Sequence, residues 1–235
     1  MKCRSLPATG CLLLMLAPTA EAIPILDQSA WGFVSPGVGM AITGEQSVAQ
    51  TFTVGVEGLL ARLDLGIWRS TLTTATDVLL DIVPAEGGLR DFDFTGSLAS
   101  AVINVSAIPV CPDWCQSLPS LSVSLPVPVP VSVGDQLAIV LRRPGGTTYP
   151  DWVLWSPASW PESGVPYEGG QSHWHGRVVA SIWTALPSND NRFQTFVSPA
   201  QPIPEPASGL LALGGLATLA LNRHRARRRS ARGCR

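Results

Sequence analysis

The chain has 235 residues, of which 46% are hydrophobic and 14% charged, with 22 glycines and 21 prolines. Its formal net charge of −1 hides an uneven distribution, because residues 27 to 200 carry 15 acids and seven arginines, whereas residues 222 to 235 carry seven arginines and no acid. The strongly acidic centre argues against nucleic acid and anionic lipid as partners of that region.

The N-terminus has the order of a secretory signal peptide. Basic residues open the chain, and an apolar run follows at residues 11 to 17. Ala20 and Ala22 put small side chains at the two positions that signal peptidase reads, so we expect residues 1 to 22 to be removed. The run is too short for a membrane anchor, which needs about 20 apolar residues. A lipoprotein signal does not fit either, because Cys11 stands before the apolar run and not after it.

Between the two ends, residues 23 to 200 predict a single β-rich extracytoplasmic domain, long enough to form one sizeable core. Several runs alternate apolar and polar side chains, which is the period of a half-buried strand, and no window before Ala207 indicates an amphipathic helix. The segments expected to form strands are 47–54, 59–68, 77–83, 98–105, 136–141, 152–155, 178–183 and 192–197. Short strands separated by glycine pairs predict an all-β fold, a β-sandwich of jelly-roll type.

Prolines alternate with valines in residues 125 to 131. Alternate residues of a strand turn their N–H groups to the same side, so Pro126, Pro128 and Pro130 remove donors along one edge only. This pattern favours an edge strand protected against aggregation. The alternative is a polyproline-type linker, but a clear strand follows at once.

The domain keeps only two of the five cysteines, Cys111 and Cys115. Outside the cytoplasm, two cysteines this close together are most simply a disulfide that closes a tight loop. Half of a zinc site is the alternative, and it requires a second cysteine or histidine pair with matching spacing. No convincing second pair is present, so the sequence predicts the disulfide and no metal.

The C-terminus has the order of a membrane segment followed by a cytoplasmic stop. Residues 207 to 221 are apolar and uncharged, and the arginines follow directly. A helix of that length reaches about 22 Å. This is short of the roughly 30 Å hydrocarbon core, so bilayer thinning or snorkelling arginines must close the gap. The positive-inside rule places the C-terminus in the cytoplasm.

Directly before that segment stand Pro204, Glu205 and Pro206. The order of a P-E-P motif, a short membrane segment and a basic end, with a signal peptide at the other terminus, resembles the PEP-CTERM sorting region of Gram-negative surface proteins. The resemblance spans residues 201 to 235. It implies recognition by an exosortase, a membrane protease that cuts near the motif, commonly in bacteria that make exopolysaccharide.

The central domain also resembles sandwich domains that such proteins carry. The resemblance rests on four short motifs, at residues 50–53 (Q-T-F-T), 134–135 (G-D), 167–170 (Y-E-G-G) and 190–196 (D-N-R-F-Q-T-F). It implies the fold and leaves the activity open.

Aromatic residues give the strongest indication of a binding site. Trp152, Trp155, Trp160, Tyr167 and Trp174 lie close together in the sequence, and exposed rings of this kind are platforms for sugars. For Trp152 and Trp155, packing in the sandwich core is the interpretation that the sequence favours, since that is where most tryptophans lie.

Three other chemistries find weaker support. Residues 170 to 174 approach the G-x-S-x-G motif of serine hydrolases but lack its last glycine, and a β-rich chain lacks the strand-to-helix turn that the motif needs, so we expect a loop. His173 and His175 share one face of an extended segment without an identifiable third metal ligand. Residues 189 to 191 offer oxygens to a calcium ion, although an Asx turn is the simpler interpretation.

These observations predict a non-catalytic exported protein of the cell surface or extracellular matrix, without a cofactor. Its expected partners are signal peptidase, an exosortase and exopolysaccharide, and its expected association with the inner membrane is transient. The alternative is a secreted polysaccharide-active enzyme on a β-sandwich scaffold, which requires a cleft with two convergent carboxylates.

Overall fold

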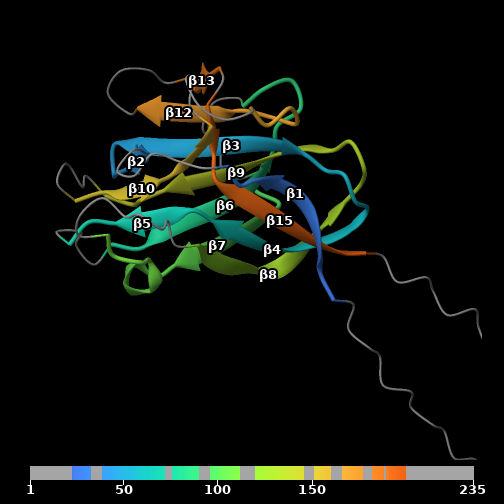
Figure 1. Cartoon of the computed structure of the whole chain (residues 1–235), viewed down its shortest axis with the longest axis horizontal. Coiled ribbons are helices and arrows are strands. Elements are labelled where there is room, and N and C mark those ends of the chain that lie inside the picture. The colour runs from blue at the N-terminus through green and yellow to red at the C-terminus, as the bar shows by residue number, and fades with distance from the viewer. Residues whose placement is uncertain are drawn as a thin grey trace, which may run out of the picture. The chain divides into compact units, whose positions relative to one another are not determined.

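The computed structural model describes residues 23–32, 39–71, 76–89, 96–111, 120–145, 151–159, 166–176, 182–187 and 189–199 (Figure 1). Almost all of its regular structure is β-strand, together with the short 3₁₀ helix η2 (Val105–Ala107), which Asn104 caps. The strands are β1 (Ile25–Ala30), β2 (Met40–Ile42), β3 (Gln46–Thr53), β4 (Gly58–Leu65), β5 (Ile67–Arg69), β6 (Val78–Pro84), β7 (Ala99–Ile103), β8 (Leu121–Val131), β9 (Gln136–Arg142), β10 (Val153–Trp155), β11 (Pro157–Ser159), β12 (Ser172–Gly176), β13 (Thr184–Leu186), β14 (Asp190–Asn191) and β15 (Phe193–Pro199). The predicted all-β class is confirmed.

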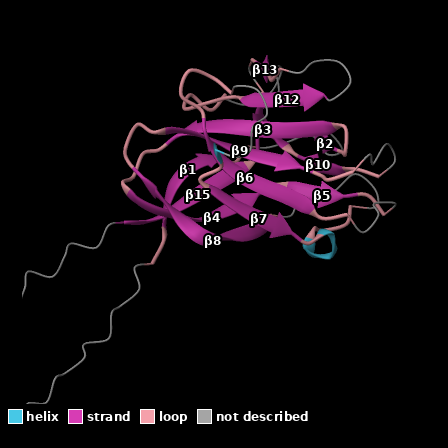
Figure 2. Cartoon of the chain, turned by 180° about the vertical axis from the view of Figure 1, so that it is seen from behind, coloured by secondary structure: helices cyan, strands magenta, loops and turns pink. Residues whose placement is uncertain are grey.

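Two antiparallel sheets form the body of the domain (Figure 2). One has the order β1-β15-β4-β8 and the other β13-β12-β3-β9-β6-β7, and smaller sheets pair β2-β10-β5 and β11-β14. A single core lies between the two large sheets, since Leu60, Leu63 and Phe193 from the first pack in the same cluster as Phe52 and Ile139 from the second. The arrangement is sandwich-like.

The predicted strand at residues 59 to 68 is two strands that belong to different sheets. Gly66 leaves the ladder between them, because its N–H donates to the Arg192 carbonyl and its own carbonyl accepts from Ser156 N–H. A Cβ at Gly66 would lie 2.6 Å from the Arg192 Cβ, so only glycine allows this close approach. β5 then continues into the sheet of β2 and β10.

One prediction for residues 170 to 183 was wrong, and another is not met at the two of its residues that the structure describes. The run expected to be a loop contains β12, which pairs with β3 on one side and β13 on the other. Of the strand expected at residues 178 to 183, the structure describes only residues 182 and 183. Neither belongs to a strand, because β13 begins at Thr184. Residues 178 to 181 lie outside the described part of the chain.

The proline-rich segment is an edge strand, as predicted. β8 forms one side of the first sheet and pairs only with β4 there. The register shifts between the pairs Leu60–Val129 and Arg62–Ser124, so residues 125 to 128 bulge out opposite a single residue of β4. Prolines fit this edge because an edge strand has one side without ladder partners.

The predicted disulfide stays a prediction. Cys111 is buried beside Trp68 and Leu154, and its N–H donates to the Arg69 carbonyl. Cys115 lies outside the described residues.

Candidate functional site

Three of the four short motifs noted in the sequence, at residues 50–53, 167–170 and 190–196, meet in one buried hydrogen-bond network. Gln50 on β3 donates from Nε2 to Asp190 Oδ1 at 3.1 Å, and its Oε1 accepts from the Asn191 N–H at 2.7 Å. The other carboxylate oxygen of Asp190 accepts from the Tyr167 N–H at 2.8 Å. The Asn191 amide donates to Ser172 Oγ at 2.9 Å. Gln50, Ser172, Asp190 and Asn191 are all buried, so the network compensates their desolvation.

The network continues to the first strand through Tyr167. Its hydroxyl donates to Gln28 Oε1 at 2.8 Å, and its ring stands edge-on to Phe193, 5.4 Å away. Burial raises the pKa of the Tyr167 hydroxyl to about 12. Thr195 accepts from the Gln28 N–H and donates to Asp27. The network therefore joins β1, β3, β12, β14 and β15 to the turn that contains Tyr167.

These partners give two of the candidate residues a structural role. Ser172 is fully buried and accepts a hydrogen bond, so it is not an exposed nucleophile. Both oxygens of Asp190 accept hydrogen bonds from the protein and hold the network together. Across the described residues, no group of three or more His, Cys, Asp and Glu side chains is arranged to hold a metal ion.

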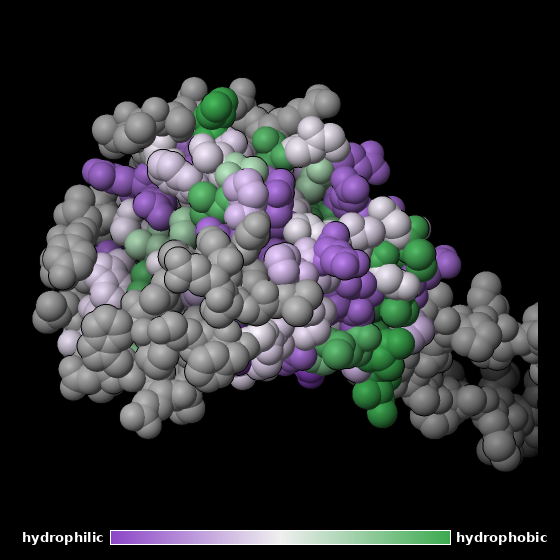
Figure 3. Space-filling model, turned by 45° about the horizontal axis from the view of Figure 1, so that its top comes forward, coloured by the Kyte–Doolittle hydropathy of each residue, from purple (hydrophilic) through white to green (hydrophobic). Residues whose placement is uncertain are grey.

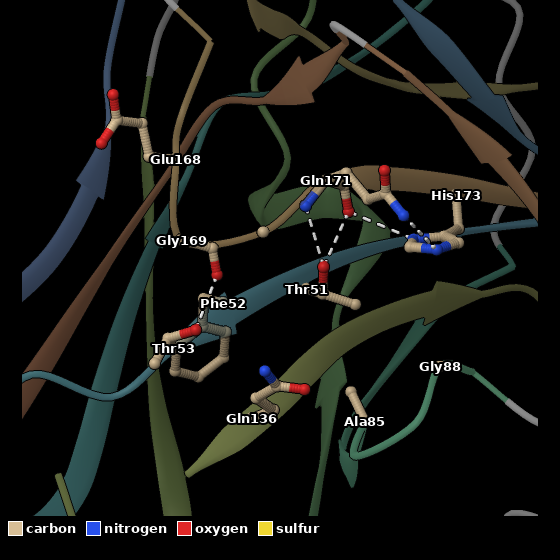
Figure 4. A pocket seen from close by; sticks show the side chains of 11 residues that line it. Thr51, Phe52, Thr53, Ala85, Gly88, Gln136, Glu168, Gly169, Gln171 and His173 are labelled. Carbon is tan, nitrogen blue, oxygen red and sulfur yellow. Dashed lines mark hydrogen bonds between the residues drawn. The ribbon is translucent and has the colours of Figure 1, made fainter. Parts of the chain in front are cut away.

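A pocket of about 340 Å³ lies on the outer face of the six-stranded sheet, beside β3 (Figure 4). Thr51 and Thr53 point away from the core, since the alternate residues Phe52 and Gln50 are buried on the other side of β3. The pocket lining is Thr51, Phe52, Thr53, Ala85, Gly88, Gln136, Glu168, Gly169, Gly170, Gln171 and His173.

One wall of the pocket is the turn at residues 168 to 171, which is fastened to β3 by threonine hydroxyls. Thr53 Oγ1 donates to the Gly169 carbonyl at 2.9 Å. Thr51 Oγ1 donates to the Gln171 carbonyl at 3.1 Å and accepts from the Gln171 N–H at 2.8 Å. A Cβ on Gly170 would lie 2.0 Å from the Thr51 carbonyl oxygen, so this glycine is what lets the turn approach the strand.

His173 forms the back of the pocket in an uncharged state. It is 6% exposed, and burial lowers its pKa. Its Nδ1 lies 3.1 Å from the Gln171 carbonyl and its Nε2 lies 3.4 Å from the Gln171 amide nitrogen. A neutral ring with the proton on Nδ1 satisfies both contacts. His175 lies on the same face of β12 and is also buried, so the two histidines are not the polar loop residues that the sequence predicted. Its ring packs against Trp183 at 5.6 Å.

Three polar side chains at the pocket are exposed: Gln136 at the start of β9, and Glu168 and Gln171 in the fastened turn. Gln136 and Glu168 supply an amide and a carboxylate, whereas the Gln171 amide contacts His173 and the hydroxyls of Thr51 and Thr53 bind the turn. The pocket therefore offers donors and acceptors for hydroxyl groups.

The structure does not bring the five predicted aromatic residues together as an exposed platform. Trp155 is fully buried and donates from its indole N–H to the Arg192 carbonyl at 2.8 Å, so it is a core residue and its assignment to the platform was wrong. Trp152 packs edge-on against Trp68 at 5.1 Å. Tyr167 and Trp174 are half-buried. Trp160 lies outside the described residues.

The pocket residues Thr51, Gln136 and Gln171 were not singled out as a site by the sequence. Thr51 and Gln171 are 120 positions apart, and only the pairing of β3 with β12 brings them into contact. The one available signal was the Q-T-F-T alternation, which puts Thr51 and Thr53 on the polar side of a strand.

The predicted sites at the chain ends, Ala20, Ala22, Pro204, Glu205 and Pro206, lie outside the described residues. Among the residues that are described, no helix has the length and hydrophobicity to cross a bilayer. No protein-family model matches the chain, and no curated protein matches its sequence.

Proposed function

We propose that the protein is a non-catalytic exported protein of the cell surface or extracellular matrix, sorted by an exosortase. The order of features in the C-terminal region carries the sorting part of this proposal: P-E-P at 204–206, the apolar residues 207–221 and the arginines after them. The domain that is delivered is a β-sandwich of jelly-roll type. This assignment is supported by a sheet order in which most neighbouring strands, such as β1 and β15, are far apart in sequence.

Exopolysaccharide is the proposed ligand, and the observation that supports it is the polar pocket beside β3. Its volume of about 340 Å³ falls in the range of about 300–1,000 Å³ that small-molecule sites occupy. The exposed Gln136 amide and Glu168 carboxylate can bind sugar hydroxyls from opposite walls. The site lies in the pocket and not on a tryptophan platform.

The pocket favours binding over hydrolysis. Glycosidases generally use a pair of carboxylates on opposite sides of the scissile bond. Among the described residues that line this pocket, Glu168 is the only one with a carboxylate. Its neighbour His173 is engaged with Gln171 and keeps a lowered pKa, so it does not replace the second acid.

The ligand proposal predicts that Glu168→Gln and Gln136→Ala weaken binding of exopolysaccharide oligosaccharides. Gln136→Ala removes a hydrogen bond, and Glu168→Gln removes the charge that strengthens one, so each should cost about 1 to 2 kcal/mol and raise Kd roughly 5- to 30-fold. Isothermal titration calorimetry on the exported protein measures the change. Glu45→Gln is the matched control, since Glu45 is an exposed acid in the turn before β3 and does not line the pocket. Unchanged affinity in both pocket variants would place the ligand elsewhere.

The sorting proposal predicts that Glu205→Ala leaves the uncut chain in the inner membrane. Processing of the wild-type protein should remove the seven C-terminal arginines and leave the acidic domain, so the mature form should migrate as a strongly acidic protein on isoelectric focusing. Glu57→Ala, a change at an exposed acid of the domain, should be processed normally. Mature surface protein that still carries its arginine-rich C-terminal peptide would contradict processing.

A further inference from the structure

Large apolar side chains are exposed at one end of the four-stranded sheet. Figure 3 shows this end as the most extended apolar area of the view, while the rest of the described surface is mixed or polar. The side chains range from 43% to 83% exposed. They are Ile23, Ile25, Leu26, Leu59, Val127 and Val133, and we call them the apolar end.

The strand register places Ile25, Leu26 and Leu59 of the apolar end beside the last residues of β15. Leu26 pairs with Phe196 and Ile25 pairs with Val197 on one side of β15. Leu59 pairs with Ser198 on the other side. β1 therefore begins, and β15 ends, within the apolar end.

The other two members come from neighbouring turns. Val127 projects from the bulge of β8 opposite β4. Val133 lies in the turn that follows β8, where the next residue, Gly134, donates from its N–H to the Val54 carbonyl. The turn after Val54 is joined to β1, because the Gly55 N–H donates to Asp27 Oδ1. These contacts bring both turns to the same end of the sheet as the start of β1.

The short connection between β15 and the C-terminal apolar segment limits how far the apolar end can lie from that segment. β15 ends at Pro199, and the apolar run begins at residue 207. Residues 200 to 206 reach at most about 25 Å when fully extended. If residues 207 to 221 span the membrane, the apolar end is the part of the domain held nearest to the bilayer surface.

We propose that the apolar end rests on the lipid bilayer while the uncut C-terminal segment is inserted. This inference depends on the membrane anchor in the proposed function and adds a second contact, made by the folded domain itself. Moving apolar side chains from water into the interfacial region of a bilayer lowers their free energy. The acidic domain disfavours anionic lipid, so a zwitterionic surface is the expected partner. The contact would hold residues 204 to 206 at the membrane surface until they are cut.

Site-specific fluorescence on the uncut chain tests the contact. The protein is purified from membranes of a host without exosortase, with Cys3, Cys11 and Cys234 changed to serine, and is reconstituted in phosphatidylcholine vesicles. An environment-sensitive label is attached at Val133→Cys or Val127→Cys, and the vesicles contain lipids with a quencher near the headgroup. Val102→Cys is the matched control, because Val102 is 66% exposed, as is Val133, but lies at the opposite end of the strands. Val102 pairs with Leu79, which pairs with Arg142 at the end of β9, whereas Val133 lies in the turn before β9 begins.

Labels at Val133 and Val127 should be quenched, with a depth of about 5 to 10 Å, whereas the label at Val102 should keep its intensity. Adding Val133→Asp should reduce quenching of the Val127 label while the chain still floats with the vesicles. Equal quenching at all three positions, or none at Val133, would overturn the contact. Energy transfer between Val133 labels on different chains, without lipid quenching, would show a second copy on this surface and also overturn it. A chain that does not float with vesicles would refute the anchor and this inference together.

Discussion

Asp190 is the residue on which the buried network depends most. Its two carboxylate oxygens accept from Gln50 and from the Tyr167 backbone, and it is 2% exposed. Asp190→Ala leaves two buried donors without acceptors, at about 1–3 kcal/mol each. We expect a loss of roughly 2 to 5 kcal/mol in the free energy of unfolding, measured by urea denaturation. Glu86→Ala, at an exposed position, should change it by less than about 0.5 kcal/mol. An equally small effect at Asp190 would contradict the role of the network.

Tyr167 makes the stability of the domain sensitive to alkali. Burial raises its pKa to about 12 from the ordinary value of 10.0. The folded state therefore keeps a proton that the unfolded chain loses first, so stability is intact below pH 10 and falls as the pH rises toward 12. Tyr167→Phe removes the titrating group and the hydrogen bond to Gln28. The variant should be less stable at pH 8 but should lose less stability between pH 9 and 11.5, as urea midpoints at each pH will show. Parallel pH dependences would assign the alkaline loss to other groups.

At the scale of the element, β8 shows how the edge of a sheet can be protected. An edge strand exposes backbone donors that another chain can use, and proline removes them. Pro126 and Pro128 are both exposed in the bulge. Pro126→Val with Pro128→Val restores two N–H donors and raises the strand propensity of the segment. We expect faster aggregation of the double variant, measured by light scattering at 37 °C.

The aggregation test needs a variant with the same gain in apolar surface but no new donor. Ser122→Val serves, since Ser122 is an exposed residue of the same strand that already has an N–H group. Equal aggregation of the two proteins would show that hydrophobicity, and not the restored donors, is responsible.

Strands that alternate strongly could be predicted individually, whereas their partners could not. β3, β6, β7, β9 and β15 lie within two residues of the predicted ranges. The split at Gly66 depends on Arg192, which is 126 positions away and reaches Gly66 only after β15 has joined the sheet. β12 was missed because its short polar sequence, Ser-His-Trp-His-Gly, gains strand structure from β3 and β13 and not from its own propensity.

For the molecule as a whole, composition and periodicity predicted the class but not the site. Apolar alternation and the lack of a helical period were enough for an all-β domain with one core. The pocket is assembled from β3, the start of β9 and the turn before β12, so its residues converge only through non-local pairing. Trp155 shows the reverse error. It is close to Trp152 and Tyr167 in sequence, but the structure buries it in the core. The local sequence therefore predicts which functional groups are present, whereas the strand topology determines which of them come into contact.

The position of β15 in its sheet has a mechanical consequence. The strand that leads to the C-terminal residues lies between β1 and β4, and it is hydrogen-bonded on both sides. A force that pulls the chain at Pro199 acts along the strand axis, while the ladder bonds of an antiparallel pair run across it. Such a force shears both ladders at once and cannot open them one bond at a time. A domain held by this strand should withstand drag from flowing liquid far better than one held by a strand that peels from an edge.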